Sequence, residues 1–202
     1  MLEKRRCGGK SSILAGIDAM NHLGTQKIQT KRLCLRRFAA GDAPAVYAHY
    51  GSDPLVNRYI NWAPSRTPAG ADTFVKTHLV RYDTDPVFYS WAIVLAGAVI
   101  GSIGLSNVND AAQSAELGYS IGSAWWGKGL ASEAASAVLT YAFNEVGFRR
   151  IFAAHHVDNA ASGRVLQKIG MRREGVMRDG QRNADGSCSD LILYGVLNAA
   201  KH

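Results

Sequence analysis

The spacing of hydrophobic residues changes several times along the chain, and each spacing predicts a type of element. Apolar and polar residues alternate in "KIQTKRLCLRRF" (residues 27–38), as they do in a half-exposed strand. Similar runs predict strands at residues 87–95, 98–108, 114–121, 149–157, 171–178 and 190–196. The small residues Ala96 and Gly97 predict a tight hairpin turn between two of these strands. A polar loop is expected at residues 179–189.

A different period marks the helices. Apolar residues recur every four positions from Leu130 to Val146, which predicts a helix of about 17 residues closed by Gly147. Further helical stretches are expected after Gly41-Asp42, at about residues 69–82, and at residues 158–170. In the last of these, Asp158 or Asn159 can cap the start and Gly170 can end the helix in the left-handed conformation. Hairpins and strand–helix–strand crossovers together predict an α/β or α+β domain around a mixed sheet.

Residues 1–26 lack sustained periodicity, so we expect an N-terminal extension there and a single domain over residues 27–198. A chain of 202 residues is long enough to bury one core of ordinary size. No linker or internal repeat divides the sequence.

The net charge of +7 favours anionic partners, such as nucleic acid, a phosphorylated cofactor or an acidic protein. No block of basic residues with interleaved aromatic residues occurs, so a dedicated nucleic-acid binder is disfavoured. The three cysteines have no metal-binding spacing, which argues against a zinc site or a disulfide framework. With no apolar stretch of about 20 residues, a cytoplasmic protein with no membrane partner is expected.

The stretch "GSAWWGKGL" (residues 122–130) is one residue away from the phosphate-binding signature of nucleotide triphosphatases. Gly129 stands where that signature requires a magnesium-binding hydroxyl, so this chemistry is excluded. The stretch keeps a strand, a glycine-rich turn and a helix start, whose unpaired N–H groups suit a pyrophosphate that needs no catalytic metal. An ordinary strand-to-helix turn is the alternative.

Two separated stretches decide between these readings. "ELGYSIGSAWWGKGLASEA" (residues 116–134) and "HHVDNAASGRVLQKIGMRREG" (residues 155–175) resemble the GNAT family of acetyl-coenzyme A-dependent N-acetyltransferases. The similarity covers about residues 28–196 and is closest to the branch that acetylates N-terminal alanine or serine of ribosomal proteins. The family signature Q/R-x-x-G-x-G/A matches residues 126–131, with Trp126 replacing Gln or Arg. The resemblance implies a single domain with a mixed, splayed sheet flanked by helices, and acetyl transfer to a primary amine.

The resemblance also implies how acetyl-coenzyme A is held. Main-chain amides of the loop would bind its pyrophosphate; these residues are Gly127, Lys128, Gly129, Leu130, Ala131 and Ser132. The Lys128 side chain either adds charge or is solvated. The pantetheine arm would run along the main chain of Tyr119, Ser120 and Ile121; the side chains of Tyr119 and Ile121 are read as core. An N–H group near Ile121 is then the expected oxyanion donor.

Catalytic roles follow from the same resemblance. Asn159 occupies a position that contacts the pantetheine arm, although it could simply be a helix cap. Leu166 stands where many members carry a tyrosine that protonates the departing thiolate, and Ser162 is the expected substitute donor.

Glu116 is the leading candidate for the general base, with His155 and His156 as rivals. An α-amine has a pKa of about 7.7–8.0, against about 10.4 for lysine, so an N-terminal acceptor needs little help from a base. No metal site is expected.

The acceptor is expected to be a protein N-terminus, for example that of a ribosomal protein. A small-molecule amine (a polyamine, an amino-acid-like toxin or an aminoglycoside) and a non-catalytic acyl-coenzyme A-binding module are the alternatives. The oligomeric state, including a homodimer, is left open. Polar residues of the expected loop could border the acceptor site; these are Arg178, Asp179, Gln181 and Arg182.

Overall fold

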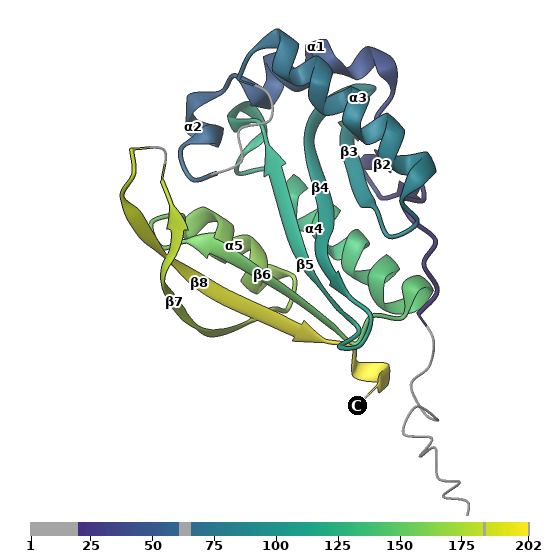
Figure 1. Cartoon of the computed structure of the whole chain (residues 1–202), viewed down its shortest axis with the longest axis vertical. Helices are drawn as coiled ribbons and strands as arrows, with labels where there is room; N and C mark the ends of the chain where they lie inside the picture. Colours follow the sequence, from purple (N-terminus) through teal and green to yellow (C-terminus); the bar gives the residue numbers. More distant parts are fainter. Residues whose placement is uncertain (1–19, 61–65, 184, 202) are drawn as a thin grey trace, which may run out of the picture.

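A computed structural model describes residues 20–60, 66–183 and 185–201, and the described strands form one eight-stranded mixed sheet with helices on both faces (Figure 1). The strands are β1 (Ile28–Gln29), β2 (Leu33–Arg36), β3 (Tyr89–Leu95), β4 (Ala98–Asn109), β5 (Ser114–Ile121), β6 (Arg150–His156), β7 (Arg172–Arg182) and β8 (Cys188–Leu197). The helices are α1 (Ala43–Val46), α2 (Pro54–Asn57), α3 (Pro68–Thr84), α4 (Leu130–Tyr141) and α5 (Ala160–Lys168). None of the described helices is long and apolar enough to span a bilayer.

The strand order is β1-β2-β3-β4-β5-β6-β8-β7, and among the described strands only β5 and β6 run parallel to each other. Their pairing is short, since it ends at Glu116 and Phe152 after three register pairs. Beyond that point the two strands diverge, as Figure 1 shows. The sheet is therefore split between the carboxyl halves of β5 and β6, which agrees with the splayed sheet that the family resemblance implies.

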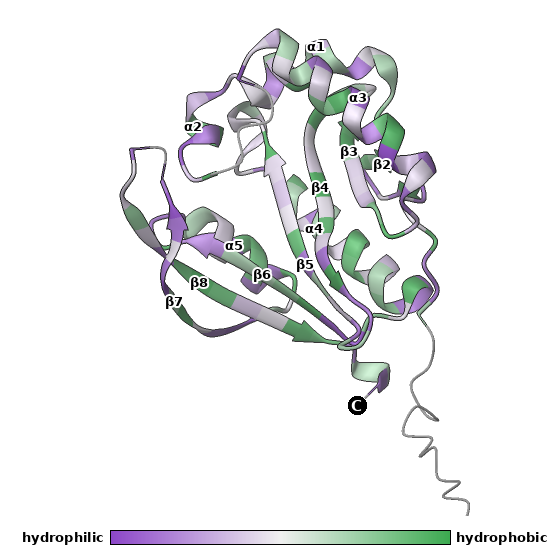
Figure 2. Ribbon diagram, viewed as in Figure 1, coloured by the Kyte–Doolittle hydropathy of each residue, from purple (hydrophilic) through white to green (hydrophobic). Residues whose placement is uncertain are grey.

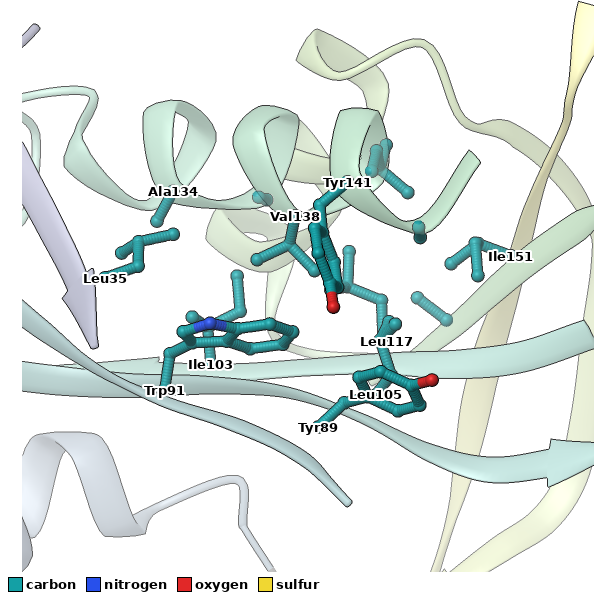
Figure 3. Packing of buried hydrophobic residues seen from close by; sticks show 14 of the residues in the cluster. Leu35, Tyr89, Trp91, Ile103, Leu105, Leu117, Ala134, Val138, Tyr141 and Ile151 are labelled. Carbon is teal, nitrogen blue, oxygen red and sulfur yellow. The ribbon is translucent and has the colours of Figure 1, made fainter. Parts of the chain in front are cut away.

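Helix α4 covers one face of the sheet. Its apolar residues at four-residue spacing are all buried in the main core; they are Leu130, Ala134, Val138 and, in the wider turn that continues the helix, Ala142 and Val146. Figure 3 shows Val138 and Tyr141 directed toward the sheet, where the Tyr141 and Trp91 rings meet edge to face at 5.7 Å. Gly147 has φ of +89° and ends the helix, so the predicted limits of this helix are confirmed.

The opposite face of the sheet carries α1 and α3 over a second, smaller core that includes Val46, Val75 and Val99. Thr67 caps α3 by accepting a hydrogen bond from Gly70 N–H, and Pro68 fits the first turn because it needs no N–H partner there. Figure 2 shows hydrophilic as well as hydrophobic residues on α3, whereas hydrophobic residues predominate along β8.

Two expectations about strands are wrong. Residues 27–38 form a hairpin, β1 and β2, rather than one strand, because the chain turns at Thr30. The Thr30 N–H donates to Leu33 C=O, and Thr30 Oγ1 accepts from Leu33 N–H. The expected loop at residues 179–189 is shorter, since β7 extends to Arg182 and β8 begins at Cys188. An exposed two-stranded ribbon tolerates polar residues on both faces, so their polarity did not preclude a strand.

Residues 20–26, at the end of the expected extension, contact the domain. Thr25 is buried and donates to Phe88 C=O, while Asn21 N–H donates to Val146 C=O at 2.9 Å. The ring nitrogens of His22 lie 2.8 Å from the Tyr89 hydroxyl and 3.0 Å from an Asp110 carboxylate oxygen. Residues 1–19 lie outside the described residues, so the boundary at residue 26 stays a prediction.

Candidate active site

The loop between β5 and α4 presents main-chain donors. Gly127 and Gly129 have φ of +74° and +73°, a conformation that glycine adopts without strain. Gly129 precedes the first turn of α4 without capping it through a side chain. Within the described part of the chain, no acceptor meets the N–H groups from Gly127 to Ser132, and Glu133 is the first residue to bond back, to Gly129 C=O. Such a set of outward N–H groups at a helix N-terminus fits a pyrophosphate.

The carbonyl groups of this loop are held by side chains. The Trp126 indole N–H donates to Ile121 C=O at 2.7 Å, and Arg32 Nη1 donates to Lys128 C=O at 2.9 Å. Lys128 Nζ folds back onto Ala124 C=O at 2.9 Å, so its ammonium group remains exposed but is bound to its own loop. Three carbonyls at or beside the loop are thus occupied, while the N–H groups stay available.

The register of β5 decides which of its main-chain groups face the split. Gly122 N–H donates to Ile100 C=O, and antiparallel pairs alternate in their hydrogen bonding, so the main chains of Ser120 and Gly118 are directed toward β4. Those of Tyr119 and Ile121 are directed away from β4, where no β6 residue is in register among the described pairs. An extended pantetheine arm could therefore pair with Tyr119 and Ile121, but not with the main chain of Ser120.

Tyr119 and Ser162 meet across the split. The Tyr119 hydroxyl, from β5, lies 2.9 Å from Ser162 Oγ and 3.2 Å from Ser162 C=O at the start of α5. Burial raises the pKa of Tyr119 to about 12, so the phenol keeps its proton at neutral pH. Sequence reasoning assigned Tyr119 a main-chain role alone; its hydroxyl was missed because an aromatic residue in an alternating strand reads as core.

Other residues of α5 take structural positions. Asn159 Oδ1 accepts from Ser162 N–H at 3.1 Å, which makes Asn159 the cap of this helix, and Gly170 has φ of +86° just beyond its end. Leu166 is 1% exposed and belongs to the main core. No phenol stands at position 166, so Tyr119 supplies the hydroxyl closest to Ser162.

Glu116 lies on the other face of the sheet. Side chains alternate along β5, so Glu116 and Gly118 are on the face opposite to Tyr119. The half-buried Glu116 carboxylate accepts from Asn107 Nδ2 at 2.7 Å and stands at the last paired position before the split. A Cβ on Gly118 would meet nothing within 4 Å, so open space lies next to this carboxylate along the strand.

The two histidines of β6 point to opposite faces. His156 shares the face of Glu116, and its ring lies 5.1 Å from that of Tyr59. His155 is buried on the face of α5, where its Nε2 would stand 2.8 Å from a Cβ on Gly163. Of the two rivals to Glu116, His156 is therefore the one on the same face.

The β7 residues expected in a polar loop are only partly brought to this region. Gln181 Nε2 donates to Tyr59 C=O at 3.4 Å, which ties the ribbon to the segment after α2. Asp179 N–H donates to Asp190 on β8, and Arg178 and Arg182 are exposed. No group of three or more potential metal ligands occurs among the described residues.

Comparisons with known proteins agree with this geometry. Residues 32–172 match the model of the acetyltransferase (GNAT) domain. The chain is 30% identical over 173 residues to an uncharacterized N-acetyltransferase, p20, of Bacillus licheniformis, covering 85% of this chain and 96% of that protein. It is 38% identical over 96 residues to the ribosomal protein uS5-alanine N-acetyltransferase of Escherichia coli, covering 47% and 49%.

Among solved structures, a GNAT-family acetyltransferase from Bacillus anthracis is 30% identical and superposes with a TM-score of 0.74, covering 86% of this chain and 99% of that one. Three findings lead to one assignment: the family model matches most of the chain, one relative is matched along nearly its whole length, and the fold is shared with solved acetyltransferases. The chain belongs to the GNAT family and is an N-acetyltransferase that uses acetyl-coenzyme A.

Proposed function

We propose that this N-acetyltransferase acts on the N-terminal α-amine of a protein. The observation that carries the proposal is the face of the sheet bearing Glu116, where one half-buried carboxylate adjoins open space over Gly118. An α-amine, with a pKa of about 7.7–8.0, needs to lose a proton to only one weak base. The similarity to a ribosomal-protein alanine N-acetyltransferase over about half of the chain supports the same acceptor class.

The charge around α2 disfavours the polycationic alternatives. A depression of about 330 Å³ is lined by Ser52, Pro54, Asn57, Arg58 and Arg66. Polyamines and aminoglycosides carry several ammonium groups, which two guanidinium groups would repel. A peptide with neutral or acidic residues after its first position would be compatible with this lining.

In the proposed reaction, groups on the two faces of the sheet have different roles. The amine approaches from the face of Glu116 and attacks the thioester carbonyl carbon, forming the C–N bond. Charge that develops on the carbonyl oxygen is stabilised by the Ile121 N–H group, which the register directs toward the split. As the C–S bond breaks, the thiolate accepts a hydrogen bond from Ser162, whose hydroxyl is held by Tyr119. The proton of the amine passes to Glu116 through water.

Acetyl transfer to a panel of acceptors, followed by mass spectrometry, tests the acceptor class. The panel contains a peptide beginning with Ala or Ser, the same peptide blocked at its N-terminus but carrying an internal lysine, spermidine and an aminoglycoside. We expect modification of the free α-amine in preference to every other amine. Preferential acetylation of spermidine or the aminoglycoside would overturn the proposed acceptor and leave the family assignment intact.

A variant tests the proposed base. Glu116→Gln keeps the hydrogen bond from Asn107 but removes the basic oxygen, so the rate at saturating substrates should fall by about 10²-fold, at the lower end of general-base contributions. His156→Gln is the matched control on the same face. If His156→Gln abolished turnover while Glu116→Gln left it unchanged, the base would be His156.

A further inference from the structure

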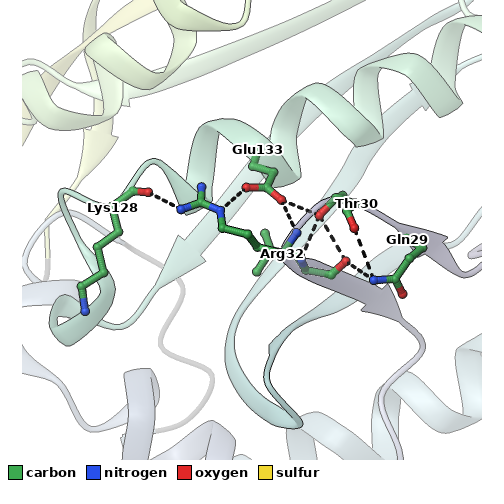
Figure 4. Close-up of polar contacts among 6 residues, drawn as sticks. Gln29, Thr30, Arg32, Lys128 and Glu133 are labelled. Atoms are coloured by element: carbon green, nitrogen blue, oxygen red, sulfur yellow. Dashed lines mark hydrogen bonds and ion pairs between the residues drawn. The ribbon is translucent and has the colours of Figure 1, made fainter.

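The turn between β1 and β2 contacts the phosphate loop, although about a hundred residues separate them in the sequence. Figure 4 shows Thr30 and Arg32 of this turn gathered around Glu133, in the first turn of α4. The turn of this hairpin, which we did not predict from the sequence, therefore lies beside the cofactor-binding loop.

Glu133 is the centre of this cluster. One carboxylate oxygen accepts from Thr30 Oγ1 at 2.6 Å and from Arg32 N–H at 2.8 Å, and the other accepts from Arg32 Nε at 2.6 Å. Three donors fix the carboxylate, and the carboxylate in turn fixes the direction of the guanidinium group. Because these bonds join a turn to a helix, they hold Arg32 at one place relative to α4.

The held guanidinium reaches the phosphate loop. Arg32 Nη1 donates to Lys128 C=O at 2.9 Å (Figure 4). The peptide bond between Lys128 and Gly129 is planar and trans, so its N–H points opposite to its C=O. Binding the carbonyl on the side of Arg32 therefore turns the Gly129 N–H to the other side, among the N–H groups that have no acceptor in the described chain.

We propose that Arg32 and Glu133 are positioning residues for acetyl-coenzyme A, which orient the Lys128–Gly129 peptide so that its N–H binds the pyrophosphate. The proposal rests on the family assignment of the cofactor and not on the identity of the acceptor. Without Arg32, this peptide can rotate, because glycine at position 129 permits several conformations. The bound pyrophosphate then has to order the loop itself, at the expense of affinity.

A merely structural ion pair would behave differently. The Arg32 and Glu133 side chains are 42% and 18% exposed, and exposed ion pairs contribute little to stability. Whatever the pair contributes to the melting temperature, a merely structural role would affect all substrates alike. A positioning role affects only those substrates that carry a pyrophosphate.

The test compares acetyl-coenzyme A with acetyl-pantetheine, which has the thioester and the arm but no pyrophosphate. For Arg32→Gln we expect the KM for acetyl-coenzyme A to rise about tenfold, the effect of losing one hydrogen bond from a charged group, with kcat within twofold of wild type. The kcat/KM for acetyl-pantetheine should be unchanged. Lys31→Gln is the matched control, because this exposed neighbour loses the same charge without a contact to the loop.

Two further variants keep the proposal falsifiable if Arg32→Gln folds poorly. Glu133→Gln should raise the KM for acetyl-coenzyme A in the same selective way. Arg32→Lys should give an intermediate value, since one ammonium group cannot reach both Glu133 and Lys128 C=O in the fork geometry of arginine. Equal losses on both thioesters, or an unchanged KM for acetyl-coenzyme A, would overturn the proposal. Calorimetry measures the affinity of the same variants for coenzyme A without any acceptor. A wrong choice of acceptor would therefore not change this affinity.

Discussion

Replacing Ser162 with alanine removes the hydroxyl that we assign to the departing thiolate. The structure indicates that this substitution lowers the free energy of unfolding only slightly. The Tyr119 hydroxyl keeps an acceptor, Ser162 C=O at 3.2 Å, and the cap from Asn159 to Ser162 N–H does not involve the lost oxygen. No buried donor is therefore left without a partner, and the melting temperature should change little.

The cost in rate should be much larger. A hydrogen bond to a charged group is worth about 1.5–3 kcal/mol, which corresponds to a rate lowered about 10- to 150-fold. Because the thiolate exists only as the C–S bond breaks, the loss should appear in kcat while the affinity for acetyl-coenzyme A is retained. Tyr119→Phe leaves the serine hydroxyl in place but no longer oriented, so its effect on kcat should be smaller.

Steady-state kinetics with both substrates varied, together with calorimetric binding of acetyl-coenzyme A, measure these quantities. The double variant should lose less than the product of the two single losses, because both act on one interaction. Weaker binding with an unchanged saturated rate would mean that Ser162 only positions the thioester. Unchanged binding and rate would refute the role altogether.

Three further predictions concern the loop, the packing of α5 and pH. Gly129→Val should abolish the rise in melting temperature caused by acetyl-coenzyme A. Gly170→Val is the control: position 170 has a similar positive φ and open space around a Cβ, so this variant should suffer comparable strain and keep the rise. Gly163→Ala brings a Cβ to 2.8 Å from His155 Nε2, so urea unfolding should show a loss of about 1–3 kcal/mol, and an unchanged midpoint would contradict the packing described. Burial tends to raise the pKa of Glu133, but hydrogen bonds from Thr30 and Arg32 hold it below its usual value. Its stabilising effect is then present above about pH 4.5 and lost as the pH falls through the lowered pKa, so the stability difference between wild type and Glu133→Gln should shrink below pH 4.5.

Much of the fold could be predicted from local patterns. The four-residue period of α4 and the glycine at position 147 define that helix, and Asn159 and Gly170 bracket α5. Both the hairpin turn at Ala96-Gly97 and the extent of β5 follow from short-range signals. These elements are determined by residues close in sequence, because capping and alternation act over one or two turns of chain.

The missed features depend on contacts distant in sequence. The turn between β1 and β2 has no glycine, proline, asparagine or aspartate, and it is held by Glu133 from a remote helix. Likewise, the glycines of the loop indicate an anion site, but nothing near them points to Arg32. The Tyr119 hydroxyl gains a partner only because the split brings α5 alongside β5.

The short ladder between β5 and β6 also has a consequence for how the molecule opens. Within the sheet, β6, β8 and β7 are attached to the remaining strands by three register pairs. Such a narrow junction favours sub-global opening, in which the C-terminal strands and α5 separate as a unit below the free energy of complete unfolding. Acetyl-coenzyme A, if bound along β5 and next to Ser162, would contact both sides of the junction. Amide protons of β6 and β8 should then exchange with solvent faster in the free enzyme and become protected when the thioester is bound. While it is bound, the substrate would thus help to hold the two parts of the sheet together.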